Sequence, residues 1–345
     1  MAGGNIQLPG RSSLNLGGCG FAAAHSLGPI KFAQEHSKIV FIEGVSAGAL
    51  VAAILISCDF NIEKLIRVWL EIDQLGASHI FLTKNRWGVK DWVGKSWYIN
   101  DGIKELINRY VNADKLLDWE GECIFVADNI TRGRNFAFST KPQDERLQKR
   151  LKENPEVLKE AILASASLAP LLPPIVIDGE WYRDGGTCSL VASDDRDIDN
   201  IFVVLNHRLD EGAGEHQEEE WNIYQGVNQF RAAVRNSVVK DIKYLKSIGY
   251  KIIEQNPTDL FDNVKVRPGA QLKLLVKDTI DAVNPLSLEP LEDRVITRKL
   301  APIFTPTNSV RSITTDKFPK GDIKLAINRS IKETEEFAER IEKEL

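Results

Sequence analysis

The pattern of apolar and polar positions is most informative between residues 38 and 56. Ile39–Ile42 is a run of β-branched and aromatic residues, short enough for a strand that is buried on both faces. Ala49–Ile56 is apolar throughout and rich in alanine and leucine, as is typical of a buried helix. The segment Gly44–Gly48 lies between them. The sequence therefore predicts a buried strand, a sharp turn and a buried helix in direct succession.

Short apolar runs and amphipathic stretches alternate along the rest of the chain. The runs have the length of strands, whereas the amphipathic stretches place apolar residues at helical spacing. The predicted strands are 14–16, 122–126, 136–139, 175–177, 180–183, 200–206 and 272–276. The predicted helices are 22–35, 59–75, 101–110, 160–169, 221–248 and 323–345. Residues 284–307 contain several prolines and are expected to be mostly irregular.

The turn between the central strand and helix carries a recognisable pattern. Its five residues, Gly44 to Gly48 with Ser46 in the middle, fit G-x-S-x-G. The order of strand, turn and helix is the context of a nucleophile elbow. Glycine tolerates unusual backbone angles and close strand–helix approach, and the helix N-terminus directs N–H groups toward developing negative charge. Ser46 is therefore the candidate nucleophile, and a tight turn with an idle serine is the alternative.

A second glycine-rich turn, Gly17–Gly20, follows the first predicted strand. A turn of this composition offers backbone N–H groups that suit a developing negative charge. The N–H groups of Gly18, Cys19 and Gly20 are therefore the candidate oxyanion hole for Ser46.

The same turn has a second interpretation as a dinucleotide-binding site. Gly18, Gly20 and Ala23 match G-x-G-x-x-G/A, and Glu43 ends the next predicted strand, where a ribose-binding acid would stand. This interpretation does not need the serine motif that directly follows Glu43. We therefore favour the oxyanion hole.

A third motif, Asp184-Gly185-Gly186, leaves the predicted strand 180–183. A carboxylate followed by two glycines can be held by backbone donors with little steric cover above it. Asp184 is therefore the candidate general base, and an ordinary Asp-Gly turn is the alternative.

In this order, the three motifs resemble those of the patatin-like lipid acyl hydrolases. The segment A-S-A-S-L-A-P-L-L-P-P, residues 164–174, also resembles the family's approach to its aspartate. The G-C-G-F form of the first motif resembles adipose triglyceride lipase-like members. The resemblance covers roughly residues 13–205 and implies a three-layer α/β fold with a mostly parallel central sheet and helices on both faces. We expect a flexible segment 1–13, a catalytic core 14–205 and a mostly helical part 206–345 packed on the same domain.

The resemblance implies a Ser46–Asp184 dyad that cleaves a fatty acyl ester of a phospholipid or an acylglycerol. Gly44 and Gly48 would shape the elbow, and Gly185 and Gly186 would shape the loop of the base. No metal or organic cofactor is implied. His207, just after a predicted strand, is the candidate for a conventional third member of the site.

A catalytically silent lipid-binding member of the family is a further alternative. The Asn and Pro that usually follow D-G-G in the family fall on Ser189 and Val191. These departures concern the loop that holds Asp184 and leave the nucleophile and base unchanged.

Composition limits the partners and the compartment. The net charge of −5 argues against a nucleic-acid-binding surface. The four cysteines are widely spaced and form no metal-ligand pattern, which favours free thiols in a reducing compartment. The first residues lack the apolar segment of a signal peptide, and no apolar run reaches the length of a membrane span. We expect a cytoplasmic protein, with peripheral membrane association as an option.

Residues 84–97 interleave tryptophans with lysines and an arginine. Trp87, Trp92 and Trp97 are therefore candidates for transient contact with a membrane or lipid-droplet surface, where tryptophan lies at the headgroup level and cations attract anionic lipid. Packing of the tryptophans against the body of the protein is the alternative, and the one we favour.

Overall fold

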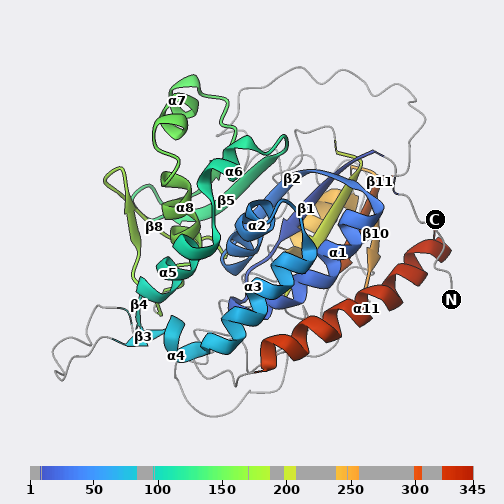
Figure 1. The fold of residues 1–345 in the computed structure, drawn as a ribbon. Helices are drawn as coiled ribbons and strands as arrows, with labels where there is room; N and C mark the ends of the chain where they lie inside the picture. Colours follow the sequence, from blue (N-terminus) through green and yellow to red (C-terminus); the bar gives the residue numbers. More distant parts are fainter. Residues whose placement is uncertain are drawn as a thin grey trace, which may run out of the picture.

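The computed structural model describes residues 8, 10–83, 96, 98–169, 171–186, 198–206, 238–246, 248–255, 299–304 and 321–344. These residues form a mixed, mostly parallel β-sheet with helices packed around it (Figure 1), which confirms the expected α/β fold. Residues 272–276 and most of 221–248, predicted as a strand and a helix, lie outside the described residues.

The strands of the main sheet follow the order β10-β11-β9-β1-β2-β5-β8-β7, and β6 pairs with β5. Neighbouring strands from β10 to β5 are parallel, whereas β6, β8 and β7 join by antiparallel pairing. A separate antiparallel pair joins β3 to β4. The bounds are β1 Arg11–Leu16, β2 Lys38–Val45, β3 Leu82–Thr83, β4 Tyr98–Ile99, β5 Glu122–Asn129, β6 Arg134–Ser139, β7 Ile175–Ile177, β8 Glu180–Asp184, β9 Asn200–Val204, β10 Tyr250–Glu254 and β11 Lys299–Phe304.

The helices lie on both faces of the sheet. The larger apolar core includes α2, whose residues Gly48–Ile56 are all buried, and a second core packs the helical residues 238–246 against the other face. No helix among the described residues is long and apolar enough to cross a membrane. The bounds are η1 Gly20–Ser26, α1 Leu27–His36, α2 Ala47–Ser57, α3 Ile62–Leu75, α4 Ala77–Ile80, α5 Asp101–Tyr110, α6 Ala113–Asp118, α7 Glu145–Glu153, α8 Val157–Ser165 and α11 Asp322–Glu344.

The helix expected over 22–35 is divided in the structure. Residues Gly20–Ser26 form the 3₁₀ helix η1, and the α-helix begins only at Leu27. Pro29 then lies in the first turn of α1, where its missing N–H has no intrahelical acceptor to lose. The chain leaving the first glycine-rich turn is therefore a tight 3₁₀ segment.

The expectation of irregular structure over 284–307 is wrong for its described residues. Lys299–Phe304 form β11, which lies between β10 and β9 despite Pro302. The register with β9 passes from Leu300 directly to Ile303, so the proline falls where that ladder is interrupted. The prolines led to a prediction of irregular structure, although pairing with β9 and β10 stabilises a strand here. Strand β10 was not predicted either.

Candidate active site

Ser46 lies at the sharp turn between β2 and α2. Its backbone has φ 56° and ψ −129°, a strained conformation for a residue with a side chain. A Cβ at Gly48 would overlap the carbonyl oxygen of Leu16, and one at Gly44 would come within 2.6 Å of Ala49 Cα. The close contact of β1, β2 and α2 therefore requires both glycines and projects Ser46 from the end of the strand.

The sheet brings Asp184 to Ser46 by an unusual pairing on one side of β5. Strand β6 follows β5 from Ile124 to Asn129, so β2 and β8 share the opposite side. The parallel strand β2 pairs as far as Val126, and the antiparallel strand β8 begins pairing at Ala127 with Asp184. The carboxyl ends of β2 and β8 thus meet beside β5. Ser46 Oγ donates a hydrogen bond of 2.5 Å to Asp184 Oδ2 at this junction.

The environment of Asp184 favours proton exchange near neutral pH. The other carboxylate oxygen, Oδ1, accepts from the N–H of Gly186 at 2.8 Å, and the N–H of Asp184 donates to the carbonyl of Ser167 at 3.0 Å. Burial raises the pKa of Asp184 from its ordinary value of 3.8 to about 7, while the hydrogen bonds from Ser46 and Gly186 oppose the rise. Asp184 is consequently a much stronger base than an exposed aspartate.

Ser165 is a further residue of this site that the sequence interpretation did not single out. It is fully buried at the end of α8 and accepts a hydrogen bond of 2.9 Å from the backbone N–H of Ser46. Its own hydroxyl donates to the carbonyl of Val126 at 2.6 Å. Ser165 therefore fastens the elbow to α8 and β5. The signal was the A-S-A-S segment, where two serines stand in an otherwise apolar run.

The first glycine-rich turn lies directly against the nucleophile. A Cβ placed on Gly18 would come within 2.5 Å of Ser46 Cβ and 3.1 Å of Ser46 Oγ. Cys19 has φ 126° and Gly20 has φ 56°, so two successive residues of the turn adopt positive φ. Gly17 is joined to the end of β9, since its N–H donates to the carbonyl of Val204 at 2.9 Å. The candidate oxyanion turn and Ser46 are therefore neighbours.

Glu43 does not fit the dinucleotide interpretation. Its side chain is fully buried within β2, where it is the register partner of Asn15 on β1. A carboxylate in the interior of the sheet cannot reach the hydroxyl groups of a ribose bound at the surface. The interpretation of Gly18, Gly20 and Glu43 as a nucleotide site is therefore dropped.

Other residues of interest lie outside the described part of the chain. These are Trp87, Trp92, Trp97, Ser189, Val191 and His207. Gly185 and Gly186 are described and follow Asp184, as the motif requires. In the part of the chain that the structure describes, no group of three or more His, Cys, Asp or Glu side chains is placed to hold a metal ion.

The fold and the site together describe an α/β protein with a serine at a strained strand–helix turn and a buried carboxylate facing it. The chain belongs to the patatin-like phospholipase family, whose family model matches residues 14–192. Membership indicates a lipid acyl hydrolase in general terms.

No curated protein sequence shows a significant match to the chain. Among solved structures, VipD from Legionella pneumophila matches with a TM-score of 0.35 and 11% sequence identity, over 98% of this chain and 67% of that one.

Proposed function

We propose that this protein is a serine hydrolase that cleaves a fatty acyl ester with a Ser46–Asp184 dyad. The observation that carries the proposal is the 2.5 Å hydrogen bond from Ser46 Oγ to Asp184 Oδ2 at the meeting point of β2 and β8. This distance lies within the reach required of a nucleophile and its general base. The pKa of Asp184 near 7 lets a carboxylate perform this role without an imidazole.

The first half of the reaction forms an acyl-enzyme. Ser46 Oγ attacks the ester carbonyl carbon while its proton passes to Asp184 Oδ2. The carbonyl oxygen becomes an oxyanion, for which we propose the backbone N–H groups of Gly18, Cys19 and Gly20 as donors. The tetrahedral intermediate then collapses, the bond to the alcohol oxygen breaks, and Asp184 returns the proton to the departing alcohol.

The second half releases the fatty acid. Asp184, again ionised, takes a proton from a water molecule that attacks the acyl carbonyl carbon. The resulting tetrahedral intermediate expels Ser46 Oγ, which regains the proton from Asp184. Atoms balance as ester plus water giving acid plus alcohol, so the residues named need no added oxidant or reductant.

We propose a phospholipid or an acylglycerol as the substrate, in keeping with the family. Strain at Ser46 and burial of Asp184 support a site built for chemistry, because both have an energetic cost that a passive lipid-binding site would not require. Cytoplasmic localisation and surface contact through Trp87, Trp92 and Trp97 stay predictions.

Labelling with a fluorophosphonate probe tests the dyad. The wild type should be labelled, Ser46→Ala should not react, and Asp184→Asn should react at least tenfold more slowly. Asp178→Asn, at an exposed aspartate in the turn before β8, is the matched control and should react like the wild type. Labelling that persists in Ser46→Ala would show that another serine is the nucleophile. A folded wild type that is neither labelled nor active on phosphatidylcholine or triacylglycerol would favour the silent lipid-binding alternative.

A further inference from the structure

Three exposed apolar side chains form a row at the edge of the molecule. Val176 on β7 and Trp181 on β8 are direct register partners, and the N–H of Ile130 donates to the carbonyl of Trp181 at 2.8 Å. Ile130 follows Asn129, the register partner of Tyr182, so it lies beside Trp181 on the same face of the sheet. The exposed fractions are 42% for Ile130, 47% for Val176 and 50% for Trp181. We call these three residues the apolar row.

The apolar row is not an outlying part of the core on that face. Moving toward the sheet centre, the next pair on the same face is Arg183 with Asp128, joined by an ion pair of 2.8 Å. Only beyond it does Val126 enter the second core cluster. A charged pair therefore separates the row from the core.

The strand that carries Trp181 is held in place by ring contacts and hydrogen bonds. On the opposite face, the ring of Tyr182 packs edge-on against Phe136 and Phe138 of β6. The N–H of Trp181 donates to Thr131 Oγ1 at 2.8 Å. The backbone of β8 and the face of Tyr182 are thus engaged, and the face of the row is exposed.

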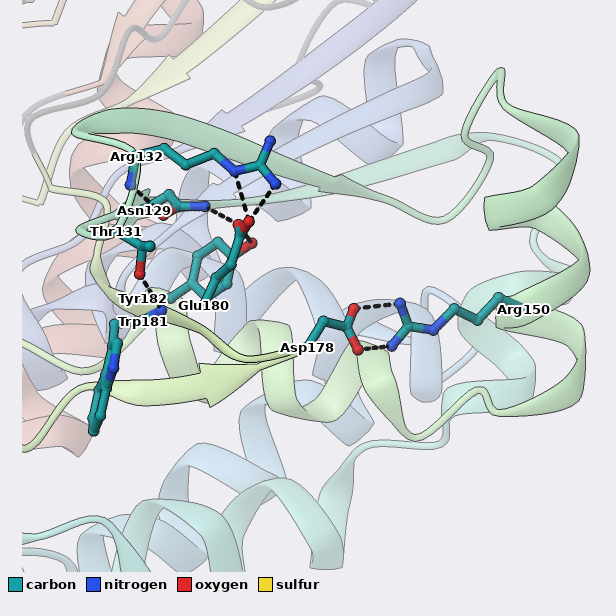
Figure 2. A network of polar contacts seen from close by, with 8 residues as sticks. All are labelled: Asn129, Thr131, Arg132, Arg150, Asp178, Glu180, Trp181 and Tyr182. Atoms are coloured by element: carbon teal, nitrogen blue, oxygen red, sulfur yellow. Dashed lines mark hydrogen bonds and ion pairs between the residues drawn. The ribbon is translucent and has the colours of Figure 1, made fainter.

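Charge pairs brace the same hairpins. Glu180 is bound by Arg132 and by Asn129 Nδ2, and Asp178 is bound by both terminal nitrogens of Arg150 (Figure 2). Figure 2 shows the ring of Trp181 directed away from the Glu180 carboxylate. The exposed indole is therefore a feature of an ordered strand.

The row lies toward the end of the sheet that carries the candidate active site, although the side chains of Trp181 and Asp184, three residues apart on β8, point to opposite faces. Strand β8 occupies the position beside β5 that β2 vacates after Val45, so the β7–β8 hairpin extends beyond the carboxyl end of β2. Trp181 precedes Asp184 by three residues on the same strand, a separation of about 10 Å. A surface that contacts the row is thereby close to the end of β8 at which Asp184 meets Ser46.

In two ion pairs of these strands and turns, the arginine is the more exposed partner. In the Arg132–Glu180 pair the side chains are 54% and 21% exposed, and in the Arg183–Asp128 pair they are 47% and 17% exposed. The guanidinium is the outer partner in both, but only Arg183 shares the face of the row, because Arg132 binds Glu180 on the face of Tyr182. An arginine beside an exposed tryptophan matches a layer of phosphates over hydrocarbon.

We propose that the apolar row and the adjacent Arg183 dock the protein on the surface of a phospholipid bilayer. The row would enter the interface and Arg183 would bind a headgroup phosphate. Three side chains are too few for a stable protein interface, which buries about 800 Å² per partner, but they suit shallow insertion. The purpose of docking, the delivery of lipid to Ser46, rests on the proposed function, whereas the binding itself does not.

Binding is measured in the Ser46→Ala background, so that it does not depend on catalysis. Vesicles of phosphatidylcholine with phosphatidylglycerol should sediment the Ser46→Ala protein. Adding Ile130→Ser, Val176→Ser and Trp181→Ser together should lower the partition coefficient about tenfold or more. Leu325→Ser is the control, because Leu325 is exposed on α11, a helix that packs against α1, η1 and α3 (Figure 1), and it should leave binding unchanged. Melting temperatures establish that each variant is folded.

A second readout locates the tryptophan. Quenching of intrinsic fluorescence by vesicles of brominated phosphatidylcholine should fall in Trp181→Phe, which keeps an aromatic side chain and should retain most of the binding. In the background with Ser46 intact, the triple variant should hydrolyse a soluble short-chain ester at the wild-type rate but phospholipid in vesicles at least fivefold more slowly. Absence of hydrolysis by the wild type would count against the proposed function. It would not affect the docking proposal, because binding is measured in the Ser46→Ala background.

Three outcomes would overturn the docking proposal. The first is a Ser46→Ala protein that does not bind the vesicles, and the second is a triple variant that binds them as well as its parent. The third is evidence that the row contacts a different surface. Such evidence would be binding through the row to triacylglycerol emulsions alone, or a dimer formed by the wild type but not by the triple variant.

Discussion

The side-chain amide nitrogen of Asn206 donates a hydrogen bond of 2.7 Å to the carbonyl oxygen of Gly17. The amide oxygen of Asn206 accepts from Ser26 Oγ at 3.0 Å. Gly17 begins the first glycine-rich turn and Ser26 ends η1, so one buried side chain next to β9 holds both ends of the segment that lies against Ser46. Asn206 therefore holds in place the turn that carries the proposed oxyanion donors.

Asn206→Ala should lower kcat for a soluble ester about tenfold or more and change KM little. The reason is that loss of two buried hydrogen bonds frees the turn that must meet the transition-state oxyanion. Ser26→Ala removes only one of the two bonds and should have a smaller effect. Steady-state kinetics with melting temperatures measure both, and a kcat that falls only in proportion to the folded fraction would assign Asn206 a purely structural role.

The activity should depend on pH through Asp184. Its pKa is raised to about 7 by burial, and the base must be ionised, so kcat/KM for a soluble ester should rise with pH and level off above an apparent pKa near 7. A pH profile from 4 to 9 measures this. A midpoint near 4 would contradict the raised pKa.

Asp184→Asn should stabilise the protein at neutral and higher pH. Because the folded pKa lies above the unfolded one, the folded state holds a proton that the unfolded state releases, and stability falls as pH rises from about 4 to 7. Asp184→Asn has no carboxyl group to ionise and avoids this loss of stability. The loss is at most roughly 4 kcal/mol, the equivalent of moving the pKa from 3.8 to about 7. Melting temperatures of the two proteins should agree near pH 4 and separate by pH 8; a constant difference would refute this linkage.

Gly28→Ala should loosen α11 from the rest of the fold. A Cβ at Gly28 would come within 2.5 Å of the carbonyl oxygen of Ser330, and the N–H of Gly28 donates to Ser330 Oγ at 3.2 Å. We expect a loss of about 1–3 kcal/mol in the free energy of unfolding, as for other overpacked buried contacts. Denaturant unfolding provides the measurement. Glu35→Gly, at an exposed position of the same helix, is the comparison for helix propensity and should cost at most about 1 kcal/mol.

Several elements were predictable because their causes are local. The apolar run 39–42, the glycines at 44 and 48 and the apolar helix 49–56 correspond to β2, the elbow and α2, with strand and helix each longer by a few residues. Helix Asp101–Tyr110 and strand Ile175–Ile177 have the predicted bounds. Boundaries were poorest where backbone conformation changed within one pattern, as in η1 and α1.

The sequence by itself determined the central strand, turn and helix, and it singled out Ser46 and Asp184, because motif and periodicity are properties of neighbouring residues. Only the tertiary structure decided that these two side chains, 138 positions apart, share a hydrogen bond. That contact depends on β8 running antiparallel in the place left by β2, a register that no local pattern encodes. The same reason applies to β11 with Pro302, to Ser165 and to Asn206. Their roles depend on partners that the sheet and helices bring from distant parts of the chain.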